Sequence, residues 1–338
     1  MGESKQMKSN LARWIATAAK FAVAMALLVW LSRRGNLSLT RLEEASTHWP
    51  ELLAILGIFY LEAFVCAWRW NLLLAAQELS IGLSESVSLT MIGFFFNTVI
   101  PGAVGGDVIK GYYLSRRMNG KKSAGLTTIL MDRLIGLFGL VLLAAGASFW
   151  TLRSFESNHA LELLRWFALA AAAGGIAALT VAVMASGRLG ILDRGESVRW
   201  LAPFVKASRS LAAYRQNPEM LLLAVGASIF NHLLSCLAFY LAFQIVGGGA
   251  IPWGYYFLLV PLGMITTVIP LSPAGVGVGQ AAFFALFQIV PGHSGAAAAN
   301  AFTIFQILLI LVYLSGVYSY LTYRRTAEAE VPAGVISG

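Results

Sequence analysis

The segments TVIPGAVGGDVIKGYY at 98–113 and TVIPLSPAGVGVGQAAFF at 267–284 begin with the same four residues. Each follows an apolar stretch, is interrupted by proline and glycines, and then continues as an apolar stretch. Before the first break, 84–100 gives about 24 Å of helix, too short to cross a membrane, and proline and glycine oppose its continuation. We predict two re-entrant helical hairpins, at 84–114 and 255–290. The alternative is two kinked full-length helices.

The composition is that of a chain built for lipid. Of its 338 residues, 58% are hydrophobic and only 12% are charged, and the mean hydropathy is +0.72. Soluble globular chains carry about a quarter charged residues. Besides the hairpins we predict an all-α integral membrane protein with six transmembrane helices of about 20 residues or more. They lie roughly at 12–31, 51–75, 126–150, 160–187, 219–246 and 298–323.

The basic residues gather in loops that this topology places on one side. We attribute the net charge of +8 to the positive-inside rule, not to nucleic-acid binding. Both termini are expected in the cytoplasm, with the chain in the inner (cytoplasmic) membrane. The loops at 110–122 and 188–215 are rich in lysine and arginine, whereas 247–297 contains neither. One loop, 33–41, is discordant because its arginines would lie outside.

Three crossings separate the predicted hairpins, and this odd number turns the second half upside down relative to the first. We therefore predict an inverted repeat with halves at 1–150 and 151–325, each with three crossings and a hairpin. A disordered cytoplasmic tail at 326–338 follows. In transporters of this architecture, opposed broken helices meet near the midplane and form the substrate site.

The first break supplies candidates for an anion site. The candidates are Asn97, Pro101, Gly105, Gly106, Asp107 and Lys110. Gly105 and Gly106 leave backbone N–H groups at the start of a helix, where the dipole favours an anion, and Lys110 could add its charge to a phosphate. Asp107 fits either an N-cap or a functional role. Asn97 either binds ligand or ties the broken backbone together.

Further ionisable residues lie inside the predicted crossings, where a charge is costly and marks a functional candidate. Asp132 and Arg133 are adjacent, so on a helix they serve different partners. Arg133 either presents its fork to a phosphate or pairs with Glu62 or Asp107. Glu62 either pairs with a cation or takes up a proton during transport. Arg69 is expected to snorkel to the inner surface.

The second break offers hydroxyl, backbone and amide groups without charge, from Ser272, Gly275, Gly277 and Gln280. The GVGVGQ run at 275–280 is superficially like a nucleotide-binding glycine loop, but no strand or βαβ unit accompanies it. The histidines are scattered, and the two cysteines have neither metal nor disulfide spacing. We expect no metal and no cofactor.

Three segments together resemble the lysylphosphatidylglycerol synthase transmembrane-domain family, in its flippase-like, stand-alone form. They are NTVIPGAVGGDVIKGYYLSRR at 97–117, MDRLIGLFGL at 131–140 and PLSPAGVGVGQAAF at 270–283. The resemblance covers roughly 12–323. It implies translocation between leaflets of lipids such as aminoacylated phosphatidylglycerol, polyprenyl-phosphate carriers or hopanoid-type lipids. The signature positions that it implies are Asn97, Pro101, Gly105, Gly106, Asp107 and Arg133.

The chain departs from the family pattern at two positions. Lys110 stands where the family often has arginine, which keeps the charge but loses the bidentate fork. Gln280 stands where an acid is common, which puts a proton-coupling role at that position in doubt. The short stretch after Tyr323 leaves no room for the soluble domain of the synthase, so we do not expect the chain to make aminoacylated lipid.

The leading hypothesis is a flippase that moves an anionic, phosphate-bearing lipid by alternating access and is not an enzyme. Its lipid would be a phospholipid or a polyprenyl-phosphate carrier, and its partners membrane lipids bound by their anionic head groups. The sequence also permits a homo-oligomer. One alternative is an intramembrane enzyme acting on a lipid phosphate, with Asp107 as its only base. Another is a membrane partner that recruits a lipid-modifying enzyme through the basic loop at 188–215.

Overall fold

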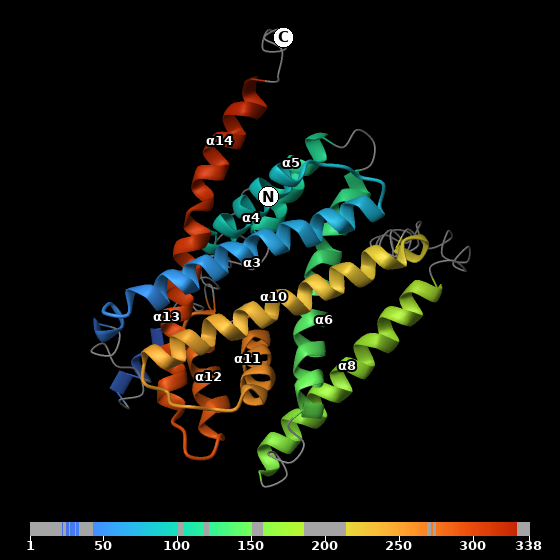
Figure 1. The fold of residues 1–338 in the computed structure, drawn as a ribbon. Coiled ribbons are helices and arrows are strands. Elements are labelled where there is room, and N and C mark those ends of the chain that lie inside the picture. The colour runs from blue at the N-terminus through green and yellow to red at the C-terminus, as the bar shows by residue number, and fades with distance from the viewer. Residues whose placement is uncertain are drawn as a thin grey trace, which may run out of the picture.

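The computed structural model describes 43–100, 105–117, 122–150, 158–185, 214–268, 272 and 275–329, with individual residues between 22 and 33. All regular structure in this part of the chain is helical (Figure 1), which confirms the all-α class. The helices are α3 (Trp49–Ala76), α4 (Leu83–Val99), α5 (Gly105–Arg117), α6 (Lys122–Trp150), α8 (His159–Ala185), α10 (Pro218–Ile245), α11 (Trp253–Val268), α12 (Val278–Gln288), α13 (Gly295–Leu314) and α14 (Gly316–Ala329).

Five candidate membrane spans among the described residues agree with five of the six predicted crossings. They are Trp49–Ala76, Ala124–Phe149, His159–Val181, Pro218–Ile245 and Gly295–Tyr323. The predicted crossing at 12–31 lies mostly outside the described residues. Those described there are helical, and the Trp30 ring meets Phe284 of α12 edge-on, with centroids 6.4 Å apart. The chain is a multi-pass membrane protein, and the placement of its termini stays a prediction.

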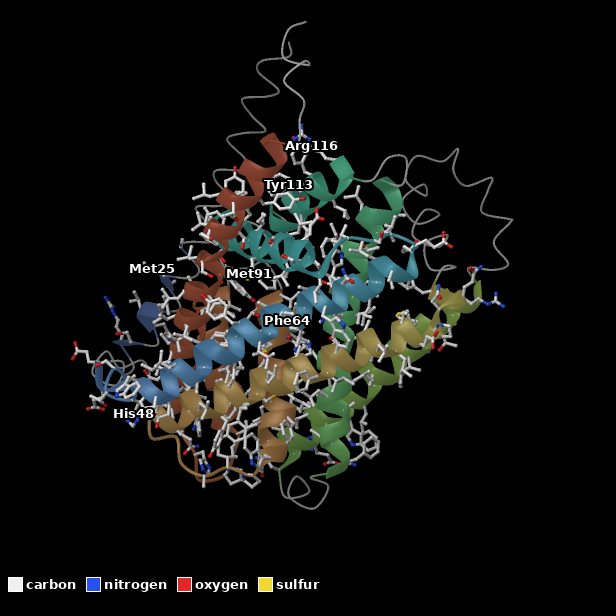
Figure 2. All side chains as sticks on the ribbon, turned by 45° about the horizontal axis from the view of Figure 1, so that its top comes forward. Met25, His48, Phe64, Met91, Tyr113 and Arg116 are labelled. Atoms are coloured by element: carbon white, nitrogen blue, oxygen red, sulfur yellow. The ribbon has the colours of Figure 1, made fainter. Side chains whose placement is uncertain are left out.

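Large apolar side chains cover the outside of the helices, as expected of a surface that faces lipid. Phe64 of α3, labelled in Figure 2, is 45% exposed, and Leu222 of α10 is 73% exposed. Of the five spans, that of α8 is the least covered by other helices, since only 11% of its most apolar stretch is buried inside the protein. Burial of apolar surface from water does not hold helices together in lipid, so their arrangement depends on close packing and polar contacts.

The packed centre lies where α10 and α3 run side by side and α11, α12 and α13 fold against them (Figure 1). Phe239 of α10 contacts Phe283 of α12 at a centroid distance of 4.7 Å. Phe283 stacks in turn on Phe302 of α13 at 4.3 Å. Offset and tilted ring pairs of this kind add attraction beyond their area. This cluster fixes the two short helices α11 and α12 against the long helices.

The first short pair, α4 and α5, folds back on itself. Gly106 lies against Gly93, and Lys110 reaches Thr90, so α5 runs antiparallel to α4. A Cβ atom at Gly106 would lie 1.9 Å from the carbonyl oxygen of Gly93, and only glycine permits this approach. The connecting residues, with the predicted site residue Pro101, lie outside those described.

The second pair, α11 and α12, is also antiparallel. Gly263 of α11 packs against Phe283 of α12, while Tyr256 near the start of α11 faces Phe287 near the end of α12. Gly275 and Gly277, ahead of α12, have φ angles of +74° and +81°, which favour glycine. Both predicted helix pairs therefore exist. That they are re-entrant, and that the halves form an inverted repeat, stay predictions.

The predicted crossing at 298–323 is interrupted. Helix α13 ends at Leu314, and α14 begins at Gly316. A Cβ atom at Gly316 would lie 2.2 Å from the carbonyl oxygen of Met91, which brings α14 onto α4. Helix α14 continues to Ala329, four residues into the predicted disordered tail, and 330–338 lie outside the described residues. The basic loop at 188–215 also lies almost entirely outside them.

Candidate functional site

A cavity of about 530 Å³ lies between α3, α4, α5, α6, α10, α11 and α13. The end of α4 contributes Asn97 and Thr98, the start of α5 contributes Asp107, and the end of α11 contributes Thr267 and Val268. The cavity therefore joins the broken ends of both short helix pairs. Its volume falls within the range of small-molecule sites.

Six of the predicted site residues line this one cavity. They are Glu62, Asn97, Asp107, Lys110, Asp132 and Arg133. The remaining described candidates contribute to the packing of the two breaks but do not line the cavity. They are Gly105, Gly106, Ser272, Gly275, Gly277 and Gln280.

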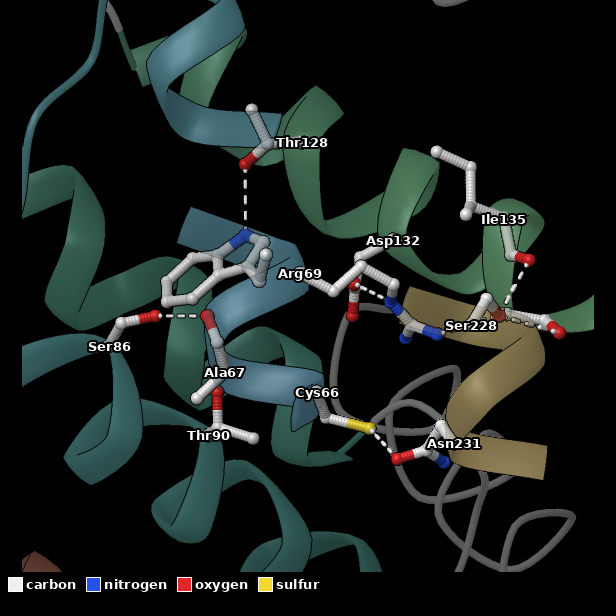
Figure 3. A network of polar contacts seen from close by, with 12 residues as sticks. Cys66, Ala67, Arg69, Ser86, Thr90, Thr128, Asp132, Ile135, Ser228 and Asn231 are labelled. Carbon is white, nitrogen blue, oxygen red and sulfur yellow. Dashed lines mark hydrogen bonds and ion pairs between the residues drawn. The ribbon is translucent and has the colours of Figure 1, made fainter. Parts of the chain in front are cut away.

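The most buried ion pair at the cavity joins Arg69 of α3 to Asp132 of α6 (Figure 3). Arg69 Nε donates to the Asp132 carboxylate at 2.8 Å, and its Nη1 donates to the Ser228 hydroxyl of α10 at 3.0 Å. Arg69 is only 5% exposed. The expectation that it snorkels to the surface is wrong. Gly136 leaves room for the guanidinium, because a Cβ atom at this position would lie 3.4 Å from Arg69 Nη1. A buried charge requires an oppositely charged partner, and Asp132 is that partner for Arg69.

A second ion pair joins α6 to α5, since Arg133 Nε donates to the carboxylate of Asp107. Asp132 and Arg133 thus serve different partners, as predicted. Of the alternatives open for Arg133, the pair with Asp107 is the one found. Asp107 lies in the first turn of α5, which begins at Gly105, so it does not occupy the N-cap. The Arg133 side chain is 42% exposed, so its remaining surface can still meet a ligand.

Lys110 of α5 has a different environment. It is 6% exposed, and its Nζ lies 3.5 Å from the Trp70 ring centroid and 3.4 Å from Thr90 Oγ1. Within the described part of the chain, no carboxylate lies within 4 Å of Nζ. Asp107 and Asp132 act on it at longer range, but each is already paired with an arginine. Trp70 stabilises the cation through its ring face without neutralising it.

Asn97 ties the first break together. Its side-chain oxygen accepts a hydrogen bond from the Gly106 backbone N–H at 2.8 Å. Of the two alternatives for Asn97, the structural tie is therefore present. It also occupies one of the two N–H groups expected to bind an anion, so the predicted site at the start of α5 is only partly available. The cationic side chains are the better candidates for holding a phosphate.

The second break is also tied internally. Gln280 is 2% exposed, accepts from the Gly277 backbone N–H at 2.7 Å and donates to Gln306 of α13 at 2.8 Å. These contacts hold the start of α12 instead of facing the cavity. The Ser272 hydroxyl is buried and has no hydrogen-bond partner among the described residues.

Glu62 of α3 lines the cavity at 8% exposure. Its carboxylate accepts a 2.6 Å hydrogen bond from the Ser235 hydroxyl of α10. No basic side chain in the described ranges lies within 4 Å of it. The cation pair, one of two alternatives for Glu62, is therefore not found in this part of the chain.

Sequence reasoning missed several residues of the site. Thr90, Ser235 and Gln306 are uncharged and lie in apolar helices, where they carry no distinctive pattern. Arg69 does carry a signal, because it is a charged residue within an apolar helix, but its sequence position suggested that it reaches the inner membrane surface. Among the described residues no three histidine, cysteine, aspartate or glutamate side chains form a metal-binding group.

Comparison with known protein families identifies the chain. The family model for the lysylphosphatidylglycerol synthase TM region matches residues 17–316, and the chain belongs to this family. The match confirms the resemblance inferred from the segments around 97–117, 131–140 and 270–283. No curated protein and no solved structure matches the chain.

Proposed function

We propose that this protein is a lipid translocase that moves an anionic, phosphate-bearing lipid between membrane leaflets. The observation that supports it best is the convergence of three basic side chains, Arg69, Lys110 and Arg133, on one cavity. They come from three different helices, and the cavity also joins the ends of both short helix pairs. A carboxylate already balances the charge of Arg69 and of Arg133, whereas the charge of Lys110 is costly within the membrane unless an anion binds it.

Lys110 is the residue to which we assign the phosphate. The charges of Arg69 and Arg133 are each neutralised by a carboxylate, whereas that of Lys110 is held by an aromatic ring and a hydroxyl. A phosphate supplies the missing negative charge and strong hydrogen-bond acceptors. The half-exposed Arg133 side chain would assist. The acyl or prenyl tails would remain in the bilayer beside the apolar part of the cavity wall.

We propose that the two short helix pairs are re-entrant hairpins, opening to opposite sides within inverted halves. In support, each half provides one antiparallel pair, and the ends of both pairs border the same cavity. Rocking of one half against the other would expose the cavity alternately to each leaflet. The distribution of basic loops supports termini in the cytoplasm and a location in the inner membrane.

The same geometry supports transport over enzymatic activity. The enzymatic alternative relied on Asp107 as a base, and Asp107 is paired with Arg133. Recruitment of a separate enzyme through the loop at 188–215 remains the competing hypothesis.

The test measures exchange of a head-group-labelled lipid in liposomes containing the purified protein. Labelled phosphatidylglycerol and a labelled polyprenyl phosphate are each read with a membrane-impermeant quencher. Lys110→Met removes the charge at similar length, and Arg116→Met is its control because Arg116 is exposed on the same helix.

We expect exchange with the unchanged protein and with Arg116→Met, and at least a tenfold slower rate with Lys110→Met. The factor corresponds to about 1.4 kcal/mol of lost interaction with the phosphate. Absence of exchange for both lipids, with and without an imposed proton gradient, would refute the proposal. An equal loss in both variants would remove Lys110 from the site.

A further inference from the structure

The lysine, arginine and carboxyl groups that line the cavity include two without an ionic partner among the described residues. The cavity is lined by three basic side chains and by three carboxyl groups. Arg69 pairs with Asp132 and Arg133 pairs with Asp107. Within the described part of the chain, Lys110 and Glu62 are in no ion pair, either with each other or with a third group.

With the two ion pairs neutral and Lys110 charged, the net charge of this set depends on Glu62. With Glu62 ionised, the six groups sum to zero, and bringing in a lipid phosphate leaves an uncompensated negative charge within the membrane. With Glu62 protonated, the set carries one positive charge at Lys110, which a phosphodiester with one negative charge neutralises. Charge inside the hydrocarbon region costs several kcal/mol when unbalanced. The neutral combination is one lipid anion with one proton.

The surroundings of Glu62 can satisfy both protonation states. Ser235 Oγ lies 2.6 Å from the Glu62 carboxylate and 3.4 Å from the backbone carbonyl of Asn231. When Glu62 is ionised, the Ser235 hydroxyl donates to it. When Glu62 is protonated, its own O–H donates to Ser235 Oγ, and the Ser235 proton can turn to the Asn231 carbonyl. No buried donor or acceptor is left unsatisfied by the change.

Other titratable groups lie around Glu62 on five helices. They are Cys66 and Arg69 on α3, Lys110 on α5, Asp132 and Arg133 on α6, His232 and Cys236 on α10, and Tyr313 on α13. His232 faces a backbone carbonyl of α6 through Nε2 at 2.9 Å. Its Nδ1 is buried without a hydrogen-bond partner among the described residues. A proton there would add a second positive charge beside that of Arg69 within the membrane, which is costly. Glu62 is the carboxyl group of the cavity that has no ionic partner among the described residues, so its charge is the one that a proton can remove.

We propose that the translocase carries one proton on Glu62 with each lipid anion, so that the combined movement is electroneutral. This inference rests on the proposed lipid translocation and adds its energy coupling. Glu62 takes its proton from water on the side to which the cavity is open and releases it on the other side. Lipid and proton move in the same direction, so labelled lipid collects in the leaflet that faces the more alkaline compartment.

The test uses the same liposomes, now with a pH difference of one unit and a trace of labelled phosphatidylglycerol. Coupling of one proton to one lipid predicts an enrichment of about tenfold in the leaflet facing the alkaline side. The enrichment should not change when valinomycin and potassium set a membrane potential. Glu62→Gln can change the rate of exchange, but the exchange that remains should show no enrichment, because the amide cannot carry the proton. The matched control is Glu51→Gln, on the same helix but outside the cavity.

The outcomes separate this inference from the function on which it rests. Lipid exchange without enrichment in the unchanged protein would overturn proton coupling and leave translocation standing. Enrichment that follows the membrane potential or a sodium gradient, or that persists in Glu62→Gln, would also overturn proton coupling and leave translocation standing. Absence of all exchange would instead refute translocation. If Glu62→Gln does not fold, Ser235→Ala replaces it and should move the pH at which the rate of lipid exchange is half-maximal, and an unchanged pH dependence of the rate would contradict the proposal.

Discussion

Removal of the Asp132 charge tests the buried ion pair at the centre of the cavity wall. Asp132→Asn leaves the Arg69 guanidinium, whose side chain is 6% exposed, with the Ser228 hydroxyl at 3.0 Å and a neutral amide in place of the carboxylate. Breaking a buried pair by removing one partner costs about 3–5 kcal/mol. The amide oxygen can still accept from Nε, which returns about 1 kcal/mol. We expect a loss of about 2–4 kcal/mol in the free energy of unfolding.

The pairing is measured by a double-mutant cycle. Arg69→Met also destabilises, because it leaves Asp132 with 16% exposure and no cation. The double variant should lose far less than the sum of the single variants, with a coupling energy of about 2 kcal/mol. Unfolding would be followed by near-ultraviolet circular dichroism in mixed micelles as sodium dodecyl sulfate is increased.

The control is Glu219→Gln, which changes an exposed acid on α10 and should alter the free energy of unfolding by no more than about 0.5 kcal/mol. Losses below about 1 kcal/mol in both single variants, with simple additivity, would refute the reasoning. Arg69 would then reach water, as the sequence alone suggested.

Three further substitutions test the packing that places the cavity. Gly106→Ala puts a Cβ atom against the carbonyl of Gly93 and should cost about 1–3 kcal/mol in thermal unfolding; an unchanged melting temperature would contradict the close contact of α4 and α5. Gln280→Met removes both hydrogen bonds at the start of α12 and should cost about 1–3 kcal/mol, whereas a neutral result would mean that the break is held otherwise. Tyr323→Phe loses the 2.7 Å bond to Glu85 and should speed proteolysis of α14 for a loss of about 0.5–1.5 kcal/mol; unchanged cleavage would show that packing alone holds α14.

Much of the helical layout could be read from local properties of the chain. Apolar length marks a span wherever a segment must cross hydrocarbon with its backbone satisfied internally, and five crossings follow this rule. Proline and glycine mark the two breaks because they act on the backbone at their own positions. The last span is interrupted at Ser315 with only one glycine, Gly316, beside it, and a single glycine does not by itself predict a break. Its break depends on the approach of Gly316 to Met91, two residues far apart in sequence.

The candidate site was predictable in its members but not in its pairings. Charges within apolar helices singled out Glu62, Lys110 and Asp132 because a buried charge is rare without a purpose. Their partners depend on how the helices are rotated and shifted against each other. That register is set by contacts such as Gly106 on Gly93, which no local pattern contains.

The sequence by itself determined that this is an all-helical membrane protein with two broken segments and a small set of intramembrane charges. Length, hydropathy and backbone chemistry act locally, so one chain suffices to read them. Only the tertiary structure decided that Arg69 turns inward to Asp132, that Asn97 and Gln280 bind their own breaks, and that Lys110 and Glu62 remain without an ionic partner among the described residues. These outcomes depend on distances between helices distant in sequence, because a side chain pairs with what packing brings within reach.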